Sequence, residues 1–162
     1  MRAAVVTVST SKASGRGEDE SGPVLVAVAR GLGAEIAGTD LVADNREQIE
    51  ARLIYWSDAQ GCDLVLTTGG TGFAPSDVTP EATRAVIERE TPGIPEAMRS
   101  ASRAHTRHWM LSRALAGIRG RTLIINFPGS PASIDQAAEP LRAAVPHAVA
   151  LVSGRPGGHA TH

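Results

Sequence analysis

Short apolar runs alternate with segments of helical periodicity along the whole chain. Four of these runs have the length of β-strands, at residues 3–8, 34–42, 63–67 and 122–126. The run at 63–67 is almost wholly apolar and leads into a glycine-rich turn, which is typical of a buried central strand. Because such runs alternate with helical segments, the pattern predicts βαβ units around a mostly parallel sheet.

Helix start signals follow the first three runs. Pro23 suits the first turn of a helix over residues 23–33, and Asn45 suits the N-cap of the next helix. Thr79 is followed by proline and predicts another N-cap. We expect that third helix to continue to about Glu90.

The second half of the chain gives a less regular pattern. We expect a helix over residues 95–104, partly helical structure over 105–115, and a final helix over roughly 132–152. Pro140 and Pro146 lie inside the final helix, where a proline removes a backbone hydrogen bond. We therefore expect that helix to be kinked or split.

The length of 162 residues corresponds to about one domain. We expect residues 1–153 to form that domain and residues 154–162 to be a disordered tail. Cys62 is the only cysteine, which excludes an intrachain disulfide and suits a reducing cytoplasm. No apolar run reaches the length that a membrane-spanning helix needs.

Composition and charge argue against a nucleic-acid-binding protein. Aromatic residues make up 3% of the chain, too few for a platform on which bases stack. The net charge is -1, so the chain has no basic surplus for a phosphate backbone.

A glycine-rich loop, Thr67-Thr68-Gly69-Gly70-Thr71-Gly72, follows the third run. Three glycines among its last four residues allow positive φ angles and a close approach of the backbone to a ligand. Consecutive amide groups can then form an anion nest, and the threonine hydroxyls add donors. The loop predicts a phosphate site, although a plain structural turn would use the same residues.

Two carboxylates follow different strands and can meet at the carboxyl ends of a parallel sheet. Asp44 follows the second run, and Asp77 precedes the helix that begins near Thr79. Beside a phosphate nest they would suit Mg²⁺, which takes few protein oxygens. Each aspartate alone is also an ordinary turn or capping residue.

Two further loops leave strand ends. The polar segment 9–20 follows the first run, and its glycines and charges predict a mobile loop that could cover a ligand. Pro128-Gly129-Ser130-Pro131 follows the fourth run and opens the final helix. That turn offers a second set of amide groups to an anion, although helix capping alone explains its composition.

The segment TTGGTGFAPSDVTPEAT at residues 67–83 resembles the MogA/MoaB family of molybdopterin adenylyltransferases, which includes the G domains of gephyrin-type proteins. The similarity continues at residues 86–93, 110–113, 116–120 and 123–131. It extends over nearly the whole chain to about residue 153. The long central motif is far more specific than a lone glycine pattern.

The resemblance implies a three-layer α/β/α sandwich with a mostly parallel central sheet, usually assembled as a homotrimer. It implies adenylyl transfer from Mg-ATP to molybdopterin, which gives adenylyl-molybdopterin and pyrophosphate in molybdenum cofactor biosynthesis. It also implies a cytoplasmic enzyme that hands its product to a MoeA-like protein, which inserts molybdate. The nucleophile would be the terminal phosphate of molybdopterin, which needs alignment and charge neutralisation more than acid–base help.

The resemblance also assigns the site residues. Asp44 and Asp77 become the catalytic residues and the ligands of Mg²⁺. Substrate and phosphate binding fall to Ser9, Thr68, Gly69, Gly70, Thr71, Gly72, Pro128, Gly129, Ser130 and Pro131.

Two positions depart from the pattern of many members. Ser76 stands where many have arginine, and Thr10 stands where many have aspartate. Arg113 is a candidate to supply the missing cation to a phosphate. The alternative function is a non-catalytic molybdopterin-binding or carrier homologue of the same fold, and an unrelated nucleotide-binding module is a third.

Overall fold

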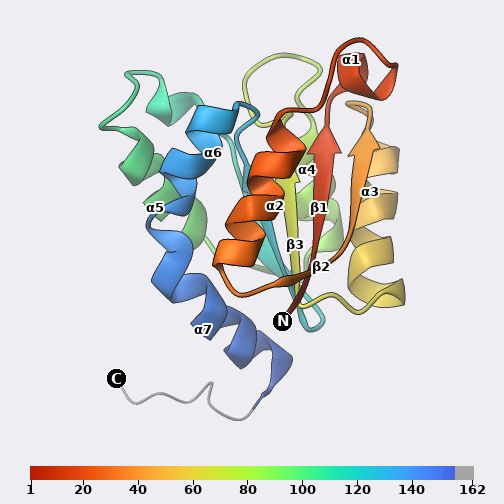
Figure 1. Cartoon of the computed structure of the whole chain (residues 1–162), viewed down its shortest axis with the longest axis vertical. Coiled ribbons are helices and arrows are strands. Elements are labelled where there is room, and N and C mark those ends of the chain that lie inside the picture. The colour runs from red at the N-terminus through yellow and green to blue at the C-terminus, as the bar shows by residue number, and fades with distance from the viewer. Residues whose placement is uncertain (156–162) are drawn as a thin grey trace.

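The four apolar runs form strands of a six-stranded sheet in the computed structural model, which describes residues 1–155 (Figure 1). The strand order is β2-β1-β3-β6-β5-β4. The strands are β1 (Arg2–Val8), β2 (Glu35–Val42), β3 (Leu64–Thr68), β4 (Arg89–Glu90), β5 (Ala116–Arg119) and β6 (Thr122–Phe127). The strands β2, β1, β3 and β6 pair in parallel, and only β5 runs against its neighbours. The predicted mostly parallel sheet is confirmed.

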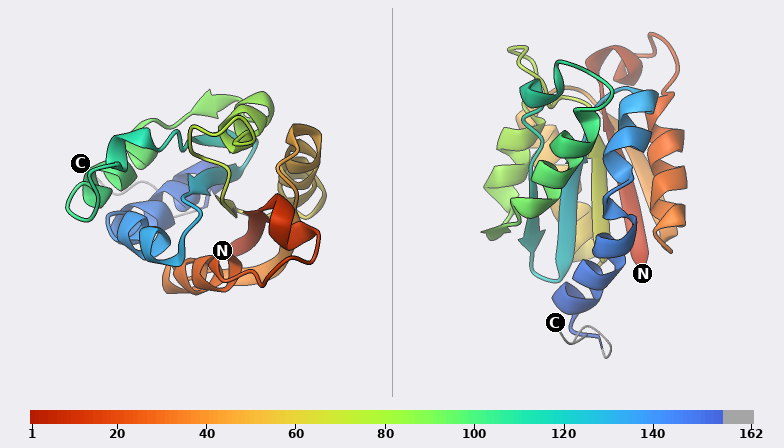
Figure 2. Two further views of the ribbon diagram at one scale, coloured as in Figure 1. Left: turned by 90° about the horizontal axis from the view of Figure 1, so that it is seen from above. Right: turned by 90° about the vertical axis from the view of Figure 1, so that its left-hand side faces the viewer.

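Helices cover both faces of this sheet and complete the expected three layers (Figure 2). One face carries α2 (Ser21–Gly31), α5 (Gly93–Ser102), α6 (Pro131–Ala138) and α7 (Leu141–Ser153). The other carries α3 (Arg46–Ile54), its π-helical continuation η1 (Tyr55–Ala59) and α4 (Thr79–Val86). Two short helices, α1 (Thr10–Ala13) and the 3₁₀ turn η2 (Trp109–Leu111), lie in loops.

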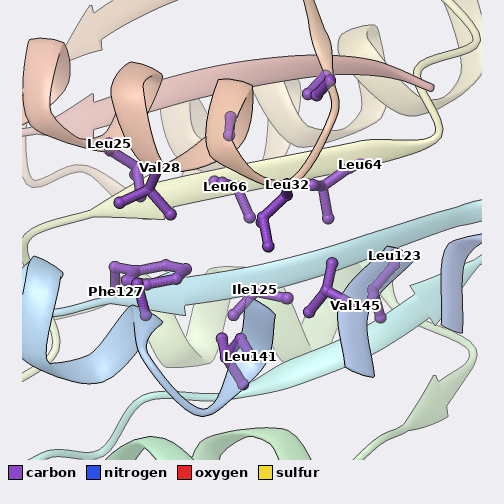
Figure 3. Close-up of a cluster of buried hydrophobic side chains, with 14 of the residues drawn as sticks. Leu25, Val28, Leu32, Leu64, Leu66, Leu123, Ile125, Phe127, Leu141 and Val145 are labelled. Atoms are coloured by element: carbon purple, nitrogen blue, oxygen red, sulfur yellow. The ribbon is translucent and has the colours of Figure 1, made fainter. Parts of the chain in front are cut away.

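Aliphatic side chains fill the larger core, on the α2 side of the sheet (Figure 3). Leu66 of β3 and Ile125 of β6 point into it together with Phe127, and all three are fully buried. Leu25 of α2 and Leu141 of α7 close it from the helical layer. Burial of a large aliphatic side chain stabilises by about 1.5–3 kcal/mol. This core therefore fixes the strand ends from which the functional loops leave.

Two of the predicted caps have the expected geometry. Asn45 caps α3 and accepts a hydrogen bond from the backbone of Gln48 at 2.9 Å. Ser130 caps α6, with Pro131 in the first turn. Cys62 is 2% exposed, and burial raises the pKa of its thiol.

The prediction for Thr79 is wrong in two respects. The N-cap of α4 is Val78, and Thr79 instead donates its buried hydroxyl to the carbonyl oxygen of Gly69 at 2.9 Å. The helix also ends at Val86 and not near Glu90. The chain becomes extended after Val86 because the next residues pair with β5, a contact that local sequence does not reveal.

The strand β5 was missing from the predicted elements. Its sequence, Ala-Gly-Ile-Arg, is short and has no apolar run, so it lacks a strand signal of its own. It forms because a tight turn, with Gly120 at φ +54°, folds it back onto β6. Partly helical structure over 105–115 is confirmed as the turn η2.

The final helical region is split as expected, because Pro140 separates α6 from α7. Pro146, in contrast, lies inside α7 without ending it. Of the tail expected over residues 154–162, Gly154 ends α7 in a left-handed conformation and Arg155 pairs with Asp63. The rest of that tail, residues 156–162, lies outside the described residues. Within the described chain, no helix has both the length and the apolarity to cross a membrane.

Candidate active site

The connections after β1 and β3 leave the sheet in opposite directions. The helix α2 follows β1 and covers one face, while α4 follows β3 and covers the other. Because β1 and β3 are neighbours, a crevice opens between their carboxyl ends, which is where open α/β sheets bind ligands. A cavity of about 460 Å³ occupies this position, within the size range of small-molecule sites.

Most of the predicted site residues line this cavity. They come from four different strand ends, and they are Ser9, Asp44, Thr68, Gly69, Gly70, Asp77, Gly129, Ser130 and Pro131. Three predicted residues, Thr71, Gly72 and Pro128, do not line it. Their place in the same loops makes them supports of the cavity wall.

Glycine is required at two positions of the loop after β3. Gly69 has φ +96°, and a Cβ atom there would lie 2.2 Å from the carbonyl oxygen of Val8. Gly70 has φ +67°, and its Cβ would lie 2.4 Å from the hydroxyl of Thr79. Both conformations are unfavourable for other residues, and no side chain fits. The loop can therefore form only with glycine at these two positions, where the backbone carries no side chain, as an anion nest requires.

Asp44 is held by the residue that departs from the family pattern. The backbone amide and the hydroxyl of Thr10 both donate to its Oδ2 atom at 2.9 Å. The same hydroxyl accepts the backbone N–H of Asp44 at 3.0 Å. Thr10 thus holds the carboxylate through two hydrogen bonds and the backbone of Asp44 through a third. The Oδ1 atom lies toward Gly70, 3.3 Å from where a Cβ would be.

Asp77 is held by its own loop. Its Oδ2 atom accepts the backbone N–H of Ala74 at 3.0 Å, and its backbone N–H donates to the carbonyl of Ala74 at 2.9 Å. The carboxylate lies beside Gly72, where a Cβ would be 2.8 Å from Oδ2. This close turn keeps the side chain at the cavity.

Arg113 fastens the loop that carries Asp77. Its guanidinium donates to the carbonyl oxygens of Gly72 and Asp77, each at 2.8 Å, and to the carboxylate of Glu81. Its backbone N–H donates to the carbonyl of Thr71 at 2.8 Å. The guanidinium holds the pKa of Glu81 below its usual value through this hydrogen bond. Arg113 does not line the cavity, so its observed role is to shape the loop and not to replace a missing phosphate cation.

The loop after β6 is joined to its neighbours by two hydroxyls. Thr68 donates to the carbonyl oxygen of Pro128 at 2.7 Å, and Ser21 donates to that of Gly129. The hydroxyl proton of Thr68 is therefore used within the protein, although the sequence had suggested it as a donor to phosphate. These bonds connect the turn at Gly129 to the end of β3 and to the start of α2.

Six lining residues were not singled out from the sequence: Thr7, Val8, Lys12, Asp19, Glu20 and Ser21. The Asp19 carboxylate accepts the hydroxyl of Thr7 at 2.7 Å and the backbone N–H groups of Ser21 and Gly22, which caps α2. An aspartate two residues before the helix was a readable capping signal. Nothing local to Lys12 or Glu20 indicates that they meet the cavity.

The two predicted metal ligands fit a magnesium ion that takes few protein oxygens. Residues 1–155 contain no group of three or more His, Cys, Asp or Glu side chains arranged to hold a metal. Asp44 and Asp77 line one cavity, and the hydrogen bonds formed within the described chain use only one carboxylate oxygen of each. A second oxygen of each remains for a cation whose other ligands are water and phosphate.

Comparison with known proteins identifies the family of this chain. Residues 4–147 match a family described as a probable molybdopterin binding domain. The molybdopterin adenylyltransferase of Helicobacter pylori is 48% identical over 115 residues, which are 71% of this chain and 65% of that protein. The molybdenum cofactor synthesis protein cinnamon of Drosophila melanogaster is 40% identical over 152 residues, which are 91% of this chain and 25% of that protein.

A solved structure shows the same fold. The molybdopterin biosynthesis enzyme MoaB of Thermus thermophilus superposes with a TM-score of 0.90 at 43% identity, covering 96% of this chain and 98% of that one. The chain spans a quarter of the length of cinnamon and 65% of the length of the Helicobacter protein. The family match and the shared fold together show that the chain belongs to the MogA/MoaB-like family of molybdopterin-binding domains.

Proposed function

We propose that this chain transfers the adenylyl group of Mg-ATP to molybdopterin and releases pyrophosphate. The observation that carries the proposal is the convergence of the glycine loop, Asp44, Asp77 and the turn at Gly129 in one cavity. Relatives named molybdopterin adenylyltransferase support it. Each of these elements suits a phosphate or a cation bound to phosphate.

The proposed reaction joins two polyanions. A terminal phosphate oxygen of molybdopterin attacks the α-phosphorus of ATP, a P–O bond forms, and the bond to the β-phosphate oxygen breaks with pyrophosphate as leaving group. The attacking oxygen is already ionised, so the step needs positioning and charge neutralisation rather than a general base. In this proposal, the backbone amides around Gly69 and Gly70, and those at the start of α6, would supply both.

Asp44 and Asp77 are the residues that would hold Mg²⁺, which supplies neutralisation of phosphate charge when it is bound. The protein's own contribution is to keep both carboxylates fixed before the ligand arrives. Thr10 does this for Asp44, and the turn closed by Ala74 and Arg113 does it for Asp77. Pre-set ligands avoid reorganisation during the reaction.

A second hollow adjoins the cavity. It has a volume of about 570 Å³, lies between α2 and the edge strand β2, and shares Thr7 and Asp19 with the cavity. Pro23, Val26 and Leu41 give it a more apolar lining. The apolar hollow could hold a ring, and the adjoining polar cavity could hold phosphates. The pair of hollows therefore suits a substrate that carries both groups.

Turnover of α-labelled ATP with molybdopterin and Mg²⁺, followed for adenylyl-molybdopterin, tests the proposal. We expect product that requires all three components. Molybdopterin binding without product would overturn the proposed enzymatic activity and favour the carrier alternative. Nucleotide binding that does not depend on molybdopterin would favour a general nucleotide-binding module. The proposal also includes a homotrimer in the cytoplasm, and sedimentation of the purified chain measures the number of subunits.

A further inference from the structure

The proposed cavity is lined by more negative than positive side chains. Asp19, Glu20, Asp44 and Asp77 contribute carboxylates, and Lys12 is the only cation among its lining residues within the described chain. Two phosphate-bearing substrates would add further negative charge. A bound divalent ion offsets part of this charge, and the remainder needs a cation from the protein.

Neither Ser76 nor Arg113, the two positions considered for a phosphate-binding cation, supplies one to the cavity. Ser76 is exposed and does not line the cavity. Arg113 lies close to the loop in space, but its guanidinium is used by two carbonyl oxygens and by Glu81. Lys12 is therefore the cationic side chain that the fold delivers to this place.

Lys12 is held with its charge unpaired. It lies in α1, which Ser9 caps by accepting the backbone N–H of Lys12 at 3.4 Å. Its ammonium donates to the carbonyl oxygen of Glu18, a neutral partner, and it takes part in none of the ion pairs formed within residues 1–155. An ammonium group has three donors, so two remain for a ligand.

The contact with Glu18 also fixes where the ammonium lies. It ties α1 to the far end of the polar loop over residues 9–20, and the aliphatic stem of Lys12 passes Gly17. The side chain is partly buried rather than extended into solvent. A long side chain held in this way loses less conformational freedom when it binds a ligand than a free surface lysine does.

We infer that Lys12 is a substrate-binding residue that contacts the polyphosphate chain, the part of the nucleotide that leaves as pyrophosphate. This inference rests on the proposed function for the identity of the substrate. The binding of inorganic pyrophosphate to Lys12 can nevertheless be measured without any turnover.

The test uses the fact that Lys12 is the only lysine in the chain. The purified protein is acetylated with a limiting amount of an amine-specific reagent, with and without inorganic pyrophosphate and Mg²⁺. Trypsin cannot cut at acetylated lysine, so the modified chain yields the peptide from Ala3 to Arg16, which mass spectrometry quantifies. The α-amino group of Met1 lies at the opposite end of β1 and serves as an internal control.

We expect pyrophosphate to slow acetylation of Lys12 about tenfold, since a charge-assisted contact occupies the amine, and to leave Met1 unaffected. Equal protection of both amines, or protection of neither, would overturn the inference. Protection of Lys12 in a protein without turnover would support the phosphate site and refute only the adenylyl transfer. The two proposals can therefore fail separately.

Variants provide the second measurement. Lys12→Gln should raise the KM for ATP about tenfold with a smaller change in kcat, and Lys12→Arg should restore most of the affinity because it restores the charge. Arg16→Gln is the matched control, because Arg16 is an exposed cation on the same loop that does not line the cavity. An unchanged KM in a folded Lys12→Gln protein, or an equal rise in Arg16→Gln, would contradict a specific contact.

Discussion

The two ends of the sheet carry cavities of nearly equal size and opposite character. The cavity at the carboxyl ends has about 460 Å³, and a hollow at the amino ends has about 450 Å³. At the amino ends each aspartate meets an arginine. Arg119 donates to Asp58 at 3.0 and 2.6 Å, and Arg155 donates to Asp63 at 3.0 and 3.1 Å.

At the carboxyl ends the aspartates have no arginine partner. Asp44 and Asp77 accept hydrogen bonds only from neutral amide and hydroxyl groups within the described residues. Their charge is oriented but not neutralised, so it remains available to a cation. The two hollows differ in whether their aspartates form ion pairs with arginine, and not in volume. This difference distinguishes the candidate active site from the hollow at the amino ends.

The largest expected effect comes from removing a charge at the carboxyl ends. Asp77→Asn should lower kcat/KM for adenylyl transfer by at least about 100-fold, since it removes a carboxylate from the place where phosphate charge is neutralised. Circular dichroism should show an intact fold. Asp63→Asn at the other end should keep normal turnover, and equal turnover in both variants would refute the distinction between the two ends.

The next effect concerns glycines with positive φ at the two ends. Gly69→Ala should destabilise the fold by about 3 kcal/mol or more, because its Cβ would overlap a backbone carbonyl in a left-handed conformation. Gly61→Ala at the amino ends should cost only about 1 kcal/mol, because nothing lies within 4 Å of its Cβ. Urea unfolding of both variants measures the difference, and similar midpoints would contradict it.

Replacing the Arg113 guanidinium, which holds the loop that carries Asp77, should have a smaller effect on catalysis. Arg113→Lys keeps the charge but cannot reach Gly72, Asp77 and Glu81 together, so kcat/KM should fall about tenfold. The fall should be mainly in kcat if the loop positions Asp77 for the reaction. Arg155→Lys at the amino ends is the control, and an equal fall there would indicate a general loss of stability.

The smallest effect concerns the ion pair of Asp58 and Arg119. The hydrogen bonds from Arg119 lower the pKa of Asp58. A lowered pKa in the folded state contributes stability at neutral pH, and that contribution disappears as pH falls below the ordinary value of about 3.8. Asp58→Asn should therefore cost less than about 1 kcal/mol at pH 7, since the pair is partly exposed, and the cost should be smaller near pH 2. Unfolding curves at both pH values measure this, and a pH-independent cost would contradict the ion pair as its cause.

Some features were readable from the sequence because they depend on neighbouring residues. The buried strands β1, β3 and β6 appeared as apolar runs, and the caps at Asn45 and Ser130 as capping residues next to helices. The conformation of the glycine loop after β3 was also foreseeable, since consecutive glycines permit φ values that other residues avoid. Apolar periodicity and caps are local, so the sequence alone determined them.

Other features depend on contacts between distant segments, so only the tertiary structure decided them. The strand β5 forms because it pairs with β6, and β4 forms because it pairs with β5, so α4 ends early. Thr79 donates its hydroxyl to the carbonyl oxygen of Gly69 and does not cap α4. Arg113 binds a loop some 40 residues away in sequence. Lys12, Asp44 and Asp77 line one cavity because strand order and register bring their loops together, regardless of their separation along the chain.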